Sequence, residues 1–258
     1  MKIFRWIAVS FSLYSKIPMP RFEWKDDDMA HSLMFFPLVG ALIAALLFAL
    51  NAAEPLMALP VAVRIIASML IPVAVTGGFH LDGFMDTEDA LSSYASKEKK
   101  LEILKDPHIG AFAVIALVKY LLIYASAITA IFLSQKSGIR AVIILGMTFV
   151  MSRCLSGLTS ISFKKAKKDG MLYEESKDRQ ILTRVVLWAF LAGALTASVL
   201  SDMLRAAAVA ATFALCTVVY RKRAYSEFGG VTGDTAGYFL VTSETFAAAV
   251  LALTLYLG

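Results

Sequence analysis

The chain has 258 residues and a net charge of +5; 59% of its residues are apolar and only 17% are charged. A soluble domain is about half apolar and about a quarter charged, and one globule of this length cannot bury such an apolar excess. The composition therefore excludes a soluble enzyme and a disordered chain. Because Cys154 and Cys216 both lie in apolar runs, a disulfide-knit secreted module is excluded as well.

We predict one all-α integral membrane domain over residues 1–258, a polytopic helical bundle of about seven transmembrane helices, with six to eight as the range. Residues 1–20 are expected to form an interfacial amphipathic helix and a proline turn, and residues 33–257 the transmembrane bundle. A signal peptide is disfavoured because the apolar part of the first segment is short and ends at Pro18 and Pro20 without a small-residue cleavage site.

Seven apolar runs follow in chain order. They are Leu33–Asn51, Leu59–Phe79, Ile109–Leu133, Ile139–Ser160, Val185–Leu200, Met203–Val219 and Thr235–Leu257. The fifth and sixth runs are short, so residues 185–219 form either two tilted spans or a helical hairpin dipping into the bilayer.

Basic residues alternate between the connecting segments. Segments 1–32, 82–108, 160–184 and 221–234 hold nineteen Lys or Arg residues, against four in the other loops. Since cytoplasmic loops hold the positive excess, we expect a cytoplasmic N-terminus and a multi-pass protein of the cytoplasmic (inner) cell membrane. The net charge then reflects topology and lipid contact, not nucleic acid, and the same reading applies to the basic run Lys164–Lys168.

The second run ends in an acidic segment. Asp82, Asp86 and Asp89 are spaced i, i+4, i+7 and fall within about 60° of one another on a helical face. Carboxylates so close repel one another unless a cation lies among them, and Mg²⁺ takes oxygen ligands that it shares with substrate phosphates. The alternative is a solvated helix end carrying ordinary surface acids.

A glycine-rich segment opens the last run. Gly229, Gly230, Thr232, Gly233 and Asp234 are candidates for substrate binding, since glycines admit a ligand close to the backbone and free amides at a helix start bind phosphate. Asp234 is equally readable as a helix cap.

The loop before the third run holds Asp106 and His108, which with His80 are further candidates for substrate binding. Capping of the next helix, with Pro107 in its first turn, explains Asp106 as well as function does. His80 and His108 are also readable as interfacial side chains.

Lys119, Arg153 and Glu244 lie inside apolar runs, each about 10 to 15 Å from the cytoplasmic end. Buried charges are costly and face cavities or partners. We expect a polar cavity open to the cytoplasm, in which Lys119 and Arg153 contact substrate and Arg153 is the better phosphate ligand. The alternative for Lys119 is pairing with Glu244.

Together these features indicate transfer chemistry on a diphosphate. A phosphotransferase joining two alcohols, a prenyltransferase and an ion-coupled transporter remain open at this level. A prenyltransferase normally has two Asp-rich motifs, and a transporter would place its acids deeper in the membrane.

Three segments carry a resemblance to a known family. GGFHLDGFMDTEDAL at 77–91, KDPHIGAF at 105–112 and GGVTGDTAG at 229–237 resemble motifs of the cobalamin synthase (adenosylcobinamide-GDP ribazoletransferase) family, and YSKIPMP at 14–20 is similar to its opening. Ala90 and Glu88 depart from the family's usual residues, and neither change touches the three aspartates.

The resemblance implies a Mg²⁺-dependent membrane enzyme that joins adenosylcobinamide-GDP to α-ribazole, or its 5′-phosphate, and releases GMP. On this basis Asp82, Asp86 and Asp89 are the expected metal ligands, with Asp86 and Asp89 also catalytic. The expected partners are the two small-molecule substrates and lipid, with a homo-oligomer left open.

Overall fold

The computed structural model describes the whole chain except residues 1, 26–27, 30, 137, 167–179 and 258. The described part is helical and contains no strand, and one isolated parallel bridge joins Lys165 to Val231. Its helices are α1 (Lys2–Tyr14), α3 (Ser32–Ala52), α4 (Glu54–Met57), α5 (Val61–Thr76), α6 (Phe79–Ser92), α7 (Lys97–Ile103), α8 (Ala111–Leu133), α9 (Gly138–Ser162), α11 (Gln180–Ser201), α12 (Met203–Glu227) and α13 (Gly233–Leu257). The predicted all-α class is confirmed.

Six of these helices, α3, α8, α9, α11, α12 and α13, are long and apolar enough to cross a membrane. The pair α5 and α6 passes the same test jointly, although the two are bent by 90° at their junction. The described chain is therefore a multi-pass membrane bundle with six spans, or seven if the bent pair is one span, within the predicted range.

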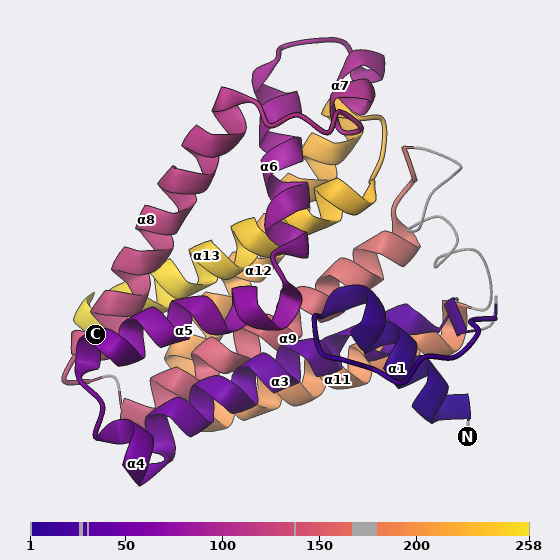
Figure 1. The fold of residues 1–258 in the computed structure, drawn as a ribbon. Helices are drawn as coiled ribbons and strands as arrows, with labels where there is room; N and C mark the ends of the chain where they lie inside the picture. The colour runs from indigo at the N-terminus through magenta and orange to yellow at the C-terminus, as the bar shows by residue number, and fades with distance from the viewer. Residues whose placement is uncertain (1, 26–27, 30, 137, 167–179, 258) are drawn as a thin grey trace.

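The bend corrects the predicted end of the second run, which we placed at Phe79. The helix stops at Thr76 because Gly77 and Gly78 both adopt left-handed backbone angles, with φ of 67° and 81°. Glycine reaches these angles without steric cost, so two in succession turn the chain sharply. The acidic segment consequently forms a separate helix, α6 (Figure 1).

The ambiguous stretch at 185–219 forms two full-length helices. α11 has 22 residues and α12 has 25, and Asp202 lies between them, its side chain accepting a hydrogen bond from the amide of Arg205. Both helices extend beyond the apolar runs at their ends near the basic segments, which is why the runs looked too short to span.

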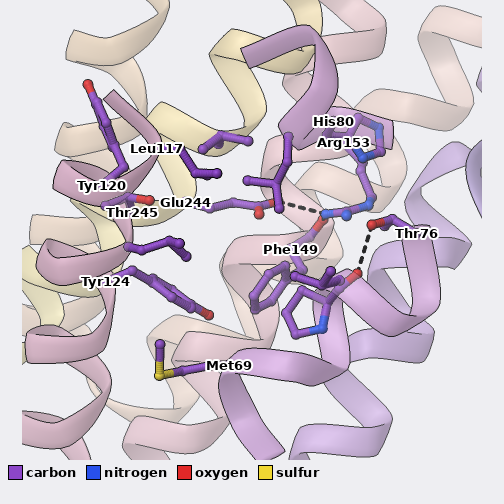
Figure 2. A pocket seen from close by; sticks show the side chains of 15 residues that line it. Met69, Thr76, His80, Leu117, Tyr120, Tyr124, Phe149, Arg153, Glu244 and Thr245 are labelled. Carbon is purple, nitrogen blue, oxygen red and sulfur yellow. Dashed lines mark hydrogen bonds and ion pairs between the residues drawn. The ribbon is translucent and has the colours of Figure 1, made fainter. Parts of the chain in front are cut away.

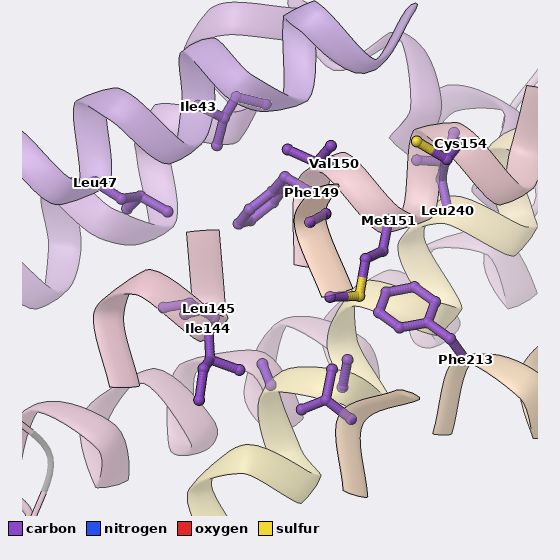
Figure 3. Packing of buried hydrophobic residues seen from close by; sticks show 14 of the residues in the cluster. Ile43, Leu47, Ile144, Leu145, Phe149, Val150, Met151, Cys154, Phe213 and Leu240 are labelled. Carbon is purple, nitrogen blue, oxygen red and sulfur yellow. The ribbon is translucent and has the colours of Figure 1, made fainter. Parts of the chain in front are cut away.

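The core is centred on α9, which packs between α3, α11 and α13. Figure 3 shows apolar side chains of α9 meeting Ile43 and Leu47 of α3, Phe213 of α12 and Leu240 of α13. Cys154 lies in this core as a free thiol, and Cys216 is also free.

The basic segments lie together at one end of the bundle. Lys100 forms an ion pair of 2.5 Å with Glu227, and Lys165 is bridged to Val231. At the other end of the bundle, near the last residues of α8 and α13, the hydroxyl of Tyr256 donates to the carbonyl of Ala130 at 3.0 Å. Three of the four segments predicted to share one side of the membrane thus contact one another through their described residues.

Candidate active site

The three aspartates of the first motif lie on α6, on the far side of the glycine bend. Asp82 is exposed, and Asp86 and Asp89 are half-buried. No residue in the described part of the chain forms a hydrogen bond or an ion pair with any of the three carboxylates. The carboxylate of Asp89 lies against Gly110, just before α8.

Asp234 joins this group from the first turn of α13. Gly83 of α6 lies so close to α13 that a Cβ on it would be 2.9 Å from the Cα of Asp234. The carboxylate of Asp86 is repelled by those of Asp82, Asp89 and Asp234, so the four acids form one negative cluster. We call these four residues the acid cluster.

The carboxylates of the acid cluster are the ligand type that a hard divalent cation prefers, but they do not form a complete coordination shell. Within the described ranges, no three His, Cys, Asp or Glu side chains are arranged to hold a metal ion by themselves. Mg²⁺ commonly takes one or two carboxylates and completes its shell with water and substrate phosphate. The residues present fit that mode of binding, since carboxylates are hard acceptors and this cluster has crowded negative charge.

The glycine-rich turn before α13 is held by its own amides. The amide of Val231 donates to the carbonyl of Lys164 at 2.8 Å, Gly230 donates to Ala224 at 3.1 Å, and Thr232 donates to the hydroxyl of Thr235 at 2.8 Å. These three amides are engaged in the fold. Of the amides expected to bind phosphate, those of Gly229 and Gly233 remain available, because they donate to no described residue.

The basic run contributes to this turn through its backbone. A Cβ on Gly230 would lie 2.5 Å from the carbonyl oxygen of Lys164, so only glycine allows this approach. Burial lowers the pKa of the neighbouring Lys165 to about 8. Lys167 and Lys168, predicted to contact lipid, lie outside the described residues.

Asp106 does not cap α8, contrary to the predicted alternative. Helix α8 begins at Ala111 with Gly110 as its N-cap, so Pro107 is not in its first turn either. The Asp106 carboxylate instead accepts from the backbone amide of His108 at 3.0 Å and contacts its Nδ1 at 2.6 Å. These bonds hold the pKa of Asp106 below its usual range, and both side chains are exposed.

Arg153 and Glu244 form a buried ion pair in the interior of the bundle. The guanidinium Nη1 of Arg153 lies 2.7 Å from a carboxylate oxygen of Glu244, with the two side chains 2% and 15% exposed. Figure 2 shows the pair at the edge of a cavity of about 90 Å³ that His80 and Tyr124 also line. Apolar side chains make up most of the lining of this cavity, and the charge of Arg153 is balanced by Glu244 at its edge. A polar cavity open to the cytoplasm stays a prediction.

Lys119 does not pair with Glu244. It is exposed on α8, with its ammonium 5.3 Å from the ring centroid of Tyr120 and close enough to Glu88 to attract it. The structure thus gathers the four acids on α6 and α13 and brings His80 and Arg153 to one interior cavity. Asp106 and His108 contact each other before α8, and Lys119 is exposed on α8.

Sequence reasoning missed the serines of α9. Ser152 donates to Glu244 at 2.6 Å, and Ser156 and Ser160 follow at intervals of four residues along the same helix. The signal was a polar stripe on one face of an apolar span.

Comparison with known proteins decides the family. The sequence model of the family described as cobalamin-5-phosphate synthase matches residues 6–252. The chain belongs to that family. It is 40% identical over 246 residues to an adenosylcobinamide-GDP ribazoletransferase of Lachnoclostridium phytofermentans, covering 94% of this chain and 90% of the relative. It is 31% identical over 248 residues to the enzyme of that name from Clostridium botulinum, covering 94% of each, and 32% identical over 240 residues to that from Listeria monocytogenes, covering 90% of each.

No solved structure matches the chain. Membership of the cobalamin-5-phosphate synthase family makes this chain a multi-pass membrane transferase of cobalamin biosynthesis, acting at a late step. The matched range includes the acid cluster, the glycine-rich turn and the Arg153–Glu244 pair.

Proposed function

We propose that this enzyme transfers the cobinamide phosphate of adenosylcobinamide-GDP to α-ribazole or its 5′-phosphate, yielding adenosylcobalamin or its 5′-phosphate and GMP. The observation that carries this proposal is the acid cluster, in which Asp82, Asp86, Asp89 and Asp234 meet from two helices. The relatives' names supply the two substrates.

Asp82 and Asp86 would hold Mg²⁺, with Asp234 at the same cation. Mg²⁺ bound there would neutralise the diphosphate and stabilise the charge on the departing phosphate. The amides of Gly229 and Gly233 donate to no described residue and would be available to phosphate oxygens.

In the reaction, a ribose hydroxyl oxygen of the acceptor attacks the phosphorus that carries the cobinamide. The new P–O bond forms as the bond to the bridging oxygen of the diphosphate breaks, and GMP leaves with that oxygen. Asp89 accepts the hydroxyl proton in our assignment, with Asp86 as the other catalytic carboxylate.

We place the acid cluster on the cytoplasmic side of the cytoplasmic membrane. The sequence puts nineteen basic residues in segments 1–32, 82–108, 160–184 and 221–234, against four in the opposite loops, and described residues of the last three segments contact one another. Both substrates are cytoplasmic small molecules on this assignment, so neither has to cross the bilayer.

The test is GMP release by the purified protein in detergent, with both substrates, Mg²⁺ and no ion gradient. We expect GMP to form in step with the cobalamin product. Absence of any released nucleotide would favour an ion-coupled transporter, and release of inorganic diphosphate would favour a prenyltransferase; either result would overturn the proposal.

A further inference from the structure

A second, smaller cavity of about 40 Å³ lies where α6, α9 and α13 meet. Residues of α1, α3, α6, α9 and α13 line it, among them Tyr14, His80, Ser156, Ser160 and Gly233. Gly233 directly precedes Asp234, so the cavity adjoins this member of the acid cluster through α13. We call it the serine cavity.

Three polar side chains line the serine cavity and make no hydrogen bond within the described residues, although the ring of His80 stacks on Phe36. His80 is 7% exposed, Ser156 is 3% exposed and Ser160 is 1% exposed. Neither serine hydroxyl nor the imidazole forms a hydrogen bond with any residue that the structure describes. Buried polar groups are nearly always hydrogen-bonded, so three unpartnered groups on one cavity indicate a polar occupant.

The lining determines the chemistry of that occupant. No Lys, Arg, Asp or Glu side chain lines the serine cavity, so the occupant is uncharged. Two serine hydroxyls can each donate and accept, and an imidazole can do either through its two nitrogens. A volume of 40 Å³ holds about three water-sized groups, which is enough for two neighbouring hydroxyls.

We propose that the serine cavity binds the hydroxyl groups of a substrate ribose through Ser156, Ser160 and His80. This inference rests on the proposed function, in which the acceptor nucleoside and the guanosine of the donor both carry a ribose. Binding there places the sugar beside Gly233, the residue that precedes Asp234 of the acid cluster.

The experiment measures KM for each substrate separately in Ser156→Ala and Ser160→Ala. Loss of one neutral hydrogen bond raises KM by about 3- to 10-fold, with kcat nearly unchanged. If KM rises for α-ribazole the bound sugar is that of the acceptor, and if KM rises for the donor it is that of guanosine; both results support the cavity as a ribose site.

Ser68→Ala is the matched control. Ser68 is 0% exposed on α5, its hydroxyl is also unpartnered among the described residues, and it does not line the serine cavity. We expect both KM values to match wild type in this variant. Because no protein hydrogen bond is lost, all three variants should keep the thermal stability of the wild type.

Unchanged KM values for both substrates in Ser156→Ala and Ser160→Ala would overturn the inference, and would mean that the cavity holds only water. An equal rise in Ser68→Ala would also overturn it. Failure of the proposed function is distinguishable, since the wild-type protein itself would then release no GMP.

Discussion

Removing Glu244 should destabilise the bundle through the charge left on Arg153. In Glu244→Leu the guanidinium Nη1 loses a carboxylate at 2.7 Å and keeps two neutral acceptors, the carbonyl of Phe149 at 2.8 Å and the hydroxyl of Ser152 at 3.2 Å. An uncompensated buried charge costs about 3 to 5 kcal/mol. We therefore expect the free energy of unfolding, measured by SDS titration in mixed micelles, to fall by about that amount.

The double variant Arg153→Met with Glu244→Leu separates the charge from the packing. With no charge to bury, its free energy of unfolding should lie within about 1 kcal/mol of wild type. Lys119→Met is the control for the alternative pairing of Lys119 with Glu244. It should lower the free energy of unfolding by less than about 1 kcal/mol, since Lys119 is exposed. A loss below about 1 kcal/mol in Glu244→Leu, or a double variant as unstable as the sum of the single ones, would refute this reasoning.

Two further outcomes follow from the turn before α13. Gly230→Ala should lower the free energy of unfolding by about 1 to 3 kcal/mol, because its Cβ would lie 2.5 Å from the carbonyl oxygen of Lys164. The control Gly193→Ala, with open space at its Cβ, should be neutral or slightly stabilising; equal losses in both would contradict the argument. Lys165 has a pKa of about 8 in the fold and 10.5 in the unfolded chain, so between these pH values the unfolded state binds more protons and stability rises with pH. Thermal unfolding across that window should show the rise in wild type and lose this contribution in Lys165→Met; identical profiles would refute it.

The acid face of α6 could be predicted from spacing alone, because helical periodicity places Asp82, Asp86 and Asp89 together whatever the rest of the chain does. The participation of Asp234 in the acid cluster could not be predicted in this way. It depends on α6 packing against α13 so closely that Gly83 meets the backbone of Asp234, a contact between residues far apart in sequence.

The pairing of Glu244 with Arg153 could not be predicted from the sequence either. Lys119 and Arg153 lie at similar depth in their spans, so depth does not choose between them. The choice follows from packing, since α9 places Arg153 inside the bundle while the position of Lys119 on α8 faces outward. Side-chain partners across helices are set by which faces pack, and an apolar run of uniform hydropathy leaves its buried face undefined.

The bend between α5 and α6 is marked in the sequence by Gly77 and Gly78. Hydropathy does not detect it, because apolar residues continue on both sides of the two glycines and extend the run to Phe79. The paired glycines mark the true boundary, and the serines at 152, 156 and 160 likewise interrupt an apolar run at helical spacing. The predicted interfacial position of residues 1–20 stays a prediction; α1 forms over Lys2–Tyr14 and packs on α3.

In the proposed function, the acid cluster holds Mg²⁺ and, through it, the diphosphate of the donor. The most direct test of this assignment is GMP release by Asp82→Asn, Asp86→Asn and Asp89→Asn at saturating Mg²⁺, with membrane insertion and thermal stability checked against wild type. Removal of a metal-binding or catalytic carboxylate should lower kcat by about 100-fold or more. Near-normal GMP release in all three variants would contradict the account.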